Sequence, residues 1–157
     1  MSGQRRSKAS EQSAPNPEDF GFGQLYRDIP DAVVVGNVET GRIELWNPAA
    51  EALFGIPADE AIGLPLEIII PEKLRARHRA GLACYRETGR GDIIDSHLPV
   101  EMAALRRNGG PITIEFRLLP VTSSRVPGRF AMAIIRDATL RKEAELDRLR
   151  LASEQAA

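Results

Sequence analysis

The residue of this chain best placed for ligand or metal chemistry is His78, one of two histidines. Leu74, His78, Leu82 and Tyr85 recur at intervals of three or four residues, so a helix through this segment places all four on one apolar face. The imidazole then points, with its apolar neighbours, toward whatever that helix covers. A neutral imidazole in such a place can ligate a metal or can be a buried structural group, and the spacing alone leaves both open.

The remaining reactive residues give weaker signals. Cys84 is the only cysteine, which excludes an intramolecular disulfide and a multi-cysteine zinc site and fits a reducing compartment. His97 falls on the opposite strand face from Leu98, where we expect it to be solvated. The sequence shows no Walker loop, kinase phosphoacceptor box, Ser-His-Asp order or metal-ligand cluster, which favours a sensory or binding module over an enzyme.

The composition is that of an ordinary globular domain. The 157 residues include 21 Lys and Arg and 22 Asp and Glu, a net charge of −1, and 43% of the residues are hydrophobic. This balance of charge argues against a dedicated nucleic-acid binder. No apolar run approaches the roughly 18–20 residues that span a bilayer. Since a secretion signal is also missing, we expect a cytoplasmic protein without a membrane partner.

The chain divides into a tail, one domain and a terminal helix. Residues 1–18 are rich in Ser, Gln, Pro and charge, which predicts a disordered tail. Residues 19–137 predict the folded domain. Residues 138–157 predict a charged helix that acts as a linker or coiled coil.

The terminal helix also predicts association. Leu146 and Leu149 fit adjacent a and d positions of a coiled coil. One helix of this length is marginal alone in water. We therefore expect this helix, together with the apolar segment from Phe20 to Ile29, to pack against a second subunit in a homodimer or against a partner.

Within the domain, apolar residues that alternate predict strands, and apolar residues at helical spacing predict helices. The expected strands cover residues 32–35, 42–46, 98–104, 112–118 and 130–135, and the expected helices cover residues 49–54, 59–62 and 72–87. Asn108-Gly109 predicts a type I′ turn between two of the strands. The order predicts an α+β fold, a five-stranded antiparallel sheet with the helices on one face. A cavity between sheet and helices is where a small ligand would bind.

Three motifs, in this order and spacing, resemble those of the PAS (Per-Arnt-Sim) sensory domain family. The segment from Trp46 to Gly55 is similar to the PAS asparagine after the second strand and the short helix that follows it. Leu105 to Gly109 resembles the turn between the family's long strands. Arg136 to Thr139 resembles the Asp-x-Thr junction between the last strand and an output helix. The resemblance implies the PAS fold and a part in signal transduction.

The resemblance also implies a signal relay. Asp137 and Thr139 would pass a signal into the C-terminal helix and on to a signalling partner in trans, regulating signalling or transcription. The same residues can also have purely structural roles. Thr139 can cap the helix, and Asp137 can favour its dipole and pair with Arg136. Asn47 and Gly55 can cap the helix that they flank, and we expect them only to build the fold.

The segment from Pro71 to Gly89 resembles the haem-binding PAS domains of rhizobial oxygen-sensor kinases. Their haem-ligating histidine occupies the position of His78, so the resemblance implies haem b as cofactor with His78 on the iron. The expected cofactor site consists of His78, Leu82, Tyr85, Leu98, Val100 and Met102.

One departure from those oxygen sensors concerns the strand after this helix. Val100 stands where they place a gas-bonding arginine, so we expect sensing of CO, NO or redox state rather than stable oxygenation. Met102 is either a second iron ligand or core packing. Leu66 stands where flavin-binding PAS photosensors carry a reactive cysteine, which argues against a flavin–cysteine photocycle.

Two other functions stay open. The same motifs would occur in a ligand-free module for protein–protein dimerisation. They would also occur in the N-terminal part of a histidine kinase or a cyclic-dinucleotide enzyme.

Overall fold

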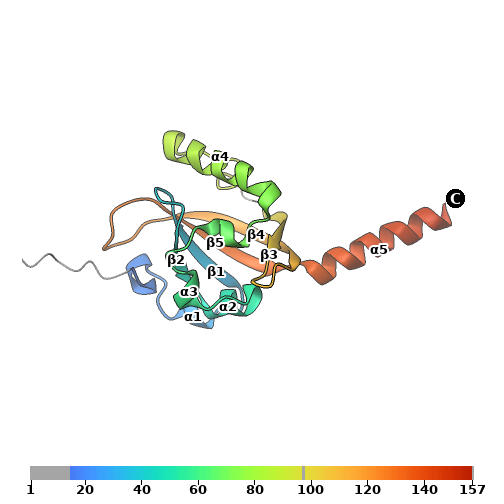
Figure 1. Cartoon of the computed structure of the whole chain (residues 1–157), viewed down its shortest axis with the longest axis horizontal. Helices are drawn as coiled ribbons and strands as arrows, with labels where there is room; N and C mark the ends of the chain where they lie inside the picture. The colour runs from blue at the N-terminus through green and yellow to red at the C-terminus, as the bar shows by residue number, and fades with distance from the viewer. Residues whose placement is uncertain (1–14, 97, 157) are drawn as a thin grey trace, which may run out of the picture.

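The computed structural model describes residues 15–96 and 98–156, and it has the α+β architecture that the sequence predicts (Figure 1). The strands are β1 (Ala32–Asn37), β2 (Ile43–Trp46), β3 (Val100–Leu105), β4 (Pro111–Val121) and β5 (Phe130–Asp137). The helices are α1 (Leu25–Asp28), α2 (Pro48–Phe54), α3 (Ala58–Ala61), α4 (Glu72–Thr88) and α5 (Thr139–Gln155), with 3-10 turns η1 (Pro17–Phe20) and η2 (Leu66–Ile69). Most of the expected tail lies outside the described residues, but Pro17 and Glu18 belong to η1 and not to a tail.

The five strands form one antiparallel sheet in the order β2-β1-β5-β4-β3. The last strand in the chain, β5, lies between β1 and β4, so the strand that leads into α5 touches both halves of the sheet. Val34 is in register with Ala133, and Phe116 is in register with Ile135 and Val100. Because residues in register project to the same face, these side chains form one inner surface.

The main core lies between this inner surface and the segment α2, α3 and η2. The rings of Trp46 and Phe54 are buried 5.2 Å apart, and the Trp46 indole donates to the Ile56 carbonyl at 2.9 Å. Gly55 ends α2 in the left-handed region, at φ 70°. This packing fixes the short helices on the sheet.

Asn47 ties the start of α2 to the rest of the core. Its side-chain oxygen accepts from the N–H groups of Ala50 and Val33 at 2.9 and 2.8 Å. Its amide nitrogen donates to the carbonyls of Tyr26 and Asp31. The side chain is fully buried and its four bonds go to the backbone, so the expected structural role of Asn47 is confirmed.

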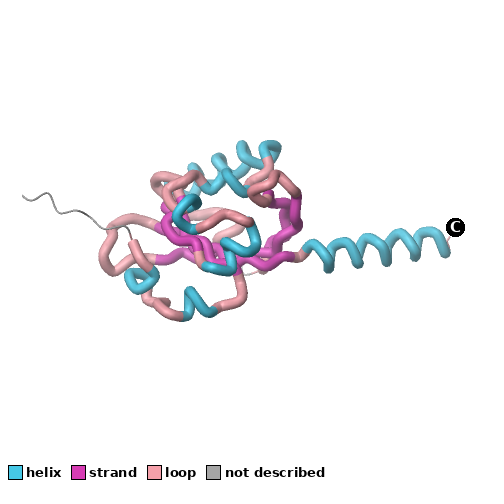
Figure 2. Tube along the Cα trace, turned by 60° about the horizontal axis from the view of Figure 1, so that its bottom comes forward, coloured by secondary structure: helices cyan, strands magenta, loops and turns pink. Residues whose placement is uncertain are grey.

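The opposite face of the sheet is covered by the N-terminal segment of the same chain. Phe20, Phe22 and Ile29 pack around Tyr26 and the buried Phe130. Figure 2 shows α1 and α4 on opposite sides of the sheet. The apolar segment that was expected to meet a second subunit is thus packed on its own sheet, because Val33 and Val35 leave that face apolar. The prediction that the helices lie on one face of the sheet therefore holds for α2, α3, η2 and α4. It does not hold for η1 and α1, which lie on the opposite face.

The turn between β3 and β4 is not the expected type I′ turn. The Gly109 N–H donates to the Arg106 carbonyl, and the Arg106 N–H donates to the Gly110 carbonyl. Gly109 has a φ of 77°, whereas Asn108 lacks the positive φ that a type I′ turn requires at both central residues. The loop therefore has three residues and places its left-handed residue last.

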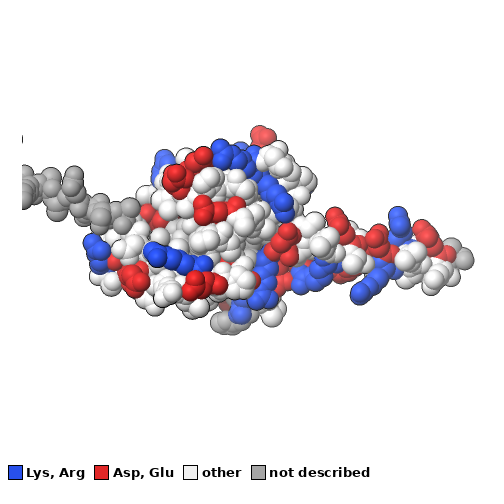
Figure 3. Space-filling view, turned by 90° about the horizontal axis from the view of Figure 1, so that it is seen from below, with Lys and Arg blue, Asp and Glu red and all other residues white. Residues whose placement is uncertain are grey.

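Helix α5 projects from the body of the molecule (Figures 1 and 2). Its four leucines, Leu140, Leu146, Leu149 and Leu151, are each more than half exposed. Positive and negative side chains alternate along it and over the adjoining face (Figure 3). None of the helices within the described residues has the length and apolar character needed to cross a bilayer.

Candidate functional site

Helix α4 is the element that positions His78. It ends at Gly89, whose φ of 68° lets its N–H return to the Tyr85 carbonyl. None of its residues is fully buried. The four residues of the predicted apolar face of α4 are half-buried: Leu74, His78, Leu82 and Tyr85. The helix therefore lies over the sheet as a cover, and the sequence-predicted face is the one that turns inward.

Two arginines hold the N-terminal half of α4. The Arg75 Nε donates to the Ile70 carbonyl at 3.0 Å. The Arg79 Nε lies 2.7 Å from a carboxylate oxygen of Glu67 in η2. These contacts tie the helix to the turn that precedes it.

The C-terminal end of α4 is held by Arg129 and by the turn between β1 and β2. Arg129 donates to the carbonyls of Tyr85 and Arg86 at 3.2 and 2.9 Å, and its guanidinium lies 5.8 Å from the centre of the Tyr85 ring. Arg86 in turn donates to the Val38 carbonyl at 2.6 Å. No local pattern in the sequence marks Arg129, because it is more than 40 residues from its partners in α4.

His78 lies between Arg75 and Arg79, within the first of these attachments, and its imidazole has an unused nitrogen. Its Nδ1 is buried and has no hydrogen-bond partner among the residues that the structure describes. Burial lowers the pKa of the imidazole below its ordinary value of 6.5, and the nearby Glu67 carboxylate opposes this shift only in part. His78 is therefore a neutral imidazole at pH 7 with a buried polar atom left unsatisfied, which native structures rarely tolerate without a ligand or a water.

The strand β3 supplies apolar side chains to the same core. Val100 and Met102 are half-buried and pack with Leu74 of α4 against the main core. Leu98 does not belong to this face: it precedes β3 and is 73% exposed. β3 begins at Val100, two residues later than predicted. Pro99 has no N–H to donate to the hydrogen bonds between the strands. His97 lies outside the described residues.

Two residues of the predicted cofactor site, Leu82 and Tyr85, lie toward the C-terminal end of α4. A Cβ on Gly41, in the β1–β2 turn, would come 3.3 Å from Leu82, so this turn touches the helix there. Tyr85 faces Arg129. Cys84 is exposed, with its sulfur 3.7 Å from the Arg90 carbonyl.

The junction before α5 is built differently from the expected cap. Thr139 does not cap the helix; its hydroxyl accepts from the Thr113 N–H at 3.1 Å and so ties α5 to β4. Asp137 accepts from the Thr139 N–H at 2.9 Å. Its ion-pair partner is Arg106 at 3.4 Å and not Arg136, which points along the sheet to Asp31.

The charge of Asp137 is stabilised at this junction. Burial alone would raise the pKa of its carboxyl, but the hydrogen bonds from Thr139 and the positive charge of Arg106 outweigh burial and bring the pKa below 3.8. The carboxylate therefore stays ionised at neutral pH and holds the first N–H of α5.

The five-stranded sheet, its helical cover and its projecting helix define a small α+β domain. The sequence model of the PAS fold matches residues 22–138. The chain belongs to the PAS family.

Two relatives are sensor proteins by name. The chain is 32% identical over 130 residues to the sensor protein FixL of Bradyrhizobium diazoefficiens, and 28% identical over 120 residues to the oxygen sensor protein DosP of Escherichia coli. The matches cover 83% and 76% of this chain but only 25% and 14% of those proteins. The chain thus corresponds to one domain of longer relatives.

A solved structure shows the same fold. The PAS domain of a protein from Colwellia psychrerythraea is 24% identical and aligns with a TM-score of 0.57 over 73% of this chain and 92% of that one. This likeness supports the strand order and the position of the helical cover.

Proposed function

We propose that this chain is a non-catalytic PAS sensory module that binds a small ligand between α4 and the sheet and relays its state through Asp137 and Thr139 to α5. The observation that carries the proposal is the buried, unpartnered Nδ1 of His78 on the inward face of α4. A helix attached at both ends and without a fully buried residue of its own is suited to cover a ligand. Kinship with two sensor proteins supports the same conclusion.

The ligand that we propose is haem b. The residues fit it, because a neutral imidazole is the form that binds iron and the core beneath α4 contains the apolar side chains of Leu74, Val100 and Met102. His78 would hold the iron, with Leu74, Val100 and Met102 against the ring. When bound, haem supplies an iron that responds to a diatomic gas or to redox state. Val100 offers no hydrogen-bond donor to a bound gas, so the proposed signal is CO, NO or redox state with Met102 as a second ligand.

Haem reconstitution tests this proposal. The purified protein is titrated with haem and followed by its Soret absorption, beside His78→Ala and the matched control His97→Ala. We expect a saturable band in the wild type and in His97→Ala, and loss or a marked shift of the band in His78→Ala. Far-UV circular dichroism verifies that each variant is folded. A wild type without a band, or a band unchanged in His78→Ala, would contradict the assignment of His78.

A second candidate is a dimerisation module that needs no ligand. It is favoured by Leu146 and Leu149 of α5, which are three residues apart on one face of the helix and more than half exposed in the single chain. Because the chain covers a quarter or less of FixL and DosP, the module can also be part of a longer histidine kinase or cyclic-dinucleotide enzyme. Association that is unchanged by haem would favour this candidate.

A further inference from the structure

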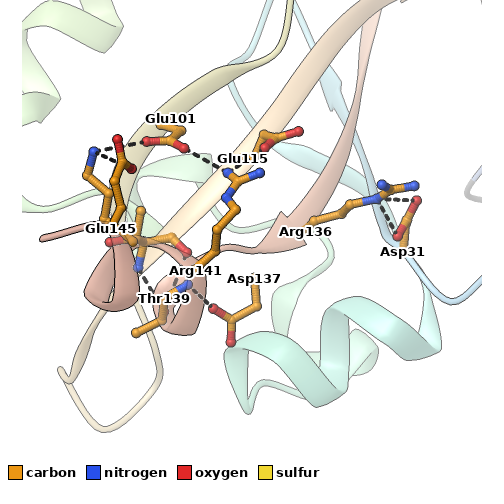
Figure 4. A network of polar contacts seen from close by, with 10 residues as sticks. Asp31, Glu101, Glu115, Arg136, Asp137, Thr139, Arg141 and Glu145 are labelled. Atoms are coloured by element: carbon orange, nitrogen blue, oxygen red, sulfur yellow. Dashed lines mark hydrogen bonds and ion pairs between the residues drawn. The ribbon is translucent and has the colours of Figure 1, made fainter. Parts of the chain in front are cut away.

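A row of charged side chains crosses the sheet where α5 begins. Glu101 of β3 is in register with Glu115 of β4, and Glu115 is in register with Arg136 of β5. Arg136 pairs with Asp31, next to β1, through distances of 3.0 and 3.1 Å from its Nε to the two carboxylate oxygens. Figure 4 shows these four residues together with the first turn of α5.

The row contains an unfavourable pair. Two carboxylates directly opposite on antiparallel strands repel each other, and Glu101 and Glu115 have this arrangement. The guanidinium of Arg141 offsets this repulsion: its Nη2 lies 2.7 Å from a carboxylate oxygen of Glu101 and 2.6 Å from one of Glu115. Lys142 lies 3.5 Å from Glu101. Arg141 and Lys142 of α5 therefore neutralise this pair of carboxylates, and releasing α5 would remove these two charges from it.

Glu115 has a second cation within reach. Residues in register on antiparallel strands have Cβ atoms about 5 Å apart, so the long side chain of Arg136 can pair with Glu115 as well as with Asp31. Asp31 is the more buried competitor, with a side chain 18% exposed against 24% for Glu115. In the structure Arg136 is turned to Asp31, which leaves Glu115 free for Arg141.

We propose that these ion pairs form a two-position switch that docks or releases α5. In the docked state Arg141 bridges Glu101 and Glu115 while Arg136 pairs with Asp31. In the released state Arg136 turns to Glu115, and Arg141 and Lys142 leave with the helix. A packed interface with two discrete arrangements is the kind of element that couples distant sites.

The sheet places this switch behind the proposed ligand site. Glu101 lies between Val100 and Met102, whose side chains pack on the inner face. Since successive strand residues point to opposite faces, a shift of β3 caused by a ligand moves Glu101 on the outer face. The regulatory use of the switch rests on the proposed function, but its two ion-pair arrangements do not.

Amide hydrogen exchange of the ligand-free protein tests the switch, read from peptides that cover the first two turns of α5. Arg141→Gln and Glu115→Gln each remove the docked arrangement, and we expect exchange there about five-fold faster, the scale of a partly exposed ion-pair network. Arg150→Gln is the matched control, because Arg150 pairs within α5 with Asp147 at 3.9 Å. In this control variant, the first two turns of α5 should exchange at the wild-type rate.

Asp31→Asn distinguishes a switch from a fixed salt bridge. It touches neither α5 nor Arg141, yet it frees Arg136 to compete for Glu115, so we expect exchange in α5 about two-fold faster. The double variant Asp31→Asn with Arg136→Gln should return to the wild-type rate. An unchanged rate in Asp31→Asn, or a fast rate that persists in the double variant, would overturn the proposal. Because no ligand is present, failure of haem to bind does not affect these outcomes.

Discussion

Asn47 and His78 show two ways in which this chain treats a buried polar side chain. Asn47 makes four hydrogen bonds to backbone groups. His78 leaves its buried Nδ1 without a partner in the described part of the chain. A fully satisfied group specifies the fold, whereas an unsatisfied one is retained at a cost that a ligand can offset. The first residue therefore has a structural role, and the second is the one for which we propose a role in binding.

Replacing Asn47 should be strongly destabilising. Asn47→Ala leaves the N–H of Val33 and Ala50 and two carbonyls without their bonds, so we expect a loss of about 2–4 kcal/mol in the free energy of unfolding. Asn47→Ser, whose hydroxyl can still cap α2, should lose less. Urea unfolding measures both. Equal losses in the two variants would mean that the α2 cap contributes nothing.

His78 should make stability depend on pH. Burial lowers its pKa in the folded protein below 6.5, so the unfolded chain binds more protons there. The stability that comes from this shift is complete above pH 6.5 and is lost as pH falls through the lower pKa of the folded state. Comparing urea unfolding of the wild type and His78→Gln from pH 7.5 to 5 should show the wild type losing more stability. Parallel curves would show that His78 titrates alike in both states.

At the scale of the elements, Asp137 should anchor α5 without affecting the ligand site. Asp137→Ala removes the acceptor for the Thr139 N–H, so we expect the first turn of α5 to weaken by about 1 kcal/mol, measured by hydrogen exchange. Haem affinity should stay at the wild-type value. Asp147→Ala, farther along α5, is the control. A wild-type rate of exchange in α5 of Asp137→Ala would show that Asp137 has no part in the relay.

The elements themselves were largely predictable, because their signals are local. Alternation marks Ile112, Ile114 and Phe116 as a strand, and all three are buried. β3 begins two residues later than the alternation predicts, since the exposed Leu98 continues the alternation across Pro99. Ion pairs between residues far apart in the sequence leave no such pattern.

The contacts that attach one element to another could not be predicted from the sequence. Arg129 reaches the end of α4 from more than 40 residues away, and Arg141 bridges two strands. Nothing in the local spacing marks either residue among 21 lysines and arginines. For the candidate site, the face of α4 and its histidine were predictable, but the means by which the helix is held were not.

At the scale of the whole molecule, α5 should mediate a homodimer. Leu146 and Leu149 are 55% and 62% exposed in the single chain, and burying them against a second α5 would stabilise a helix that is otherwise marginal. Light scattering should give a dimer for the wild type and a monomer for Leu146→Glu with Leu149→Glu. Leu98→Glu, which changes an exposed leucine outside α5, should remain dimeric. A wild-type monomer at high concentration would contradict the prediction.

The central claim is that a ligand beneath α4 changes the state of α5, and one measurement tests both halves. Hydrogen exchange of the full chain is compared with and without haem, in the wild type and in His78→Ala. The account predicts slower exchange in residues 72–88 and altered exchange in residues 139–146 when haem is added to the wild type, and neither change in His78→Ala. An unchanged α4 would contradict the ligand site, and a protected α4 with an unchanged α5 would contradict the relay.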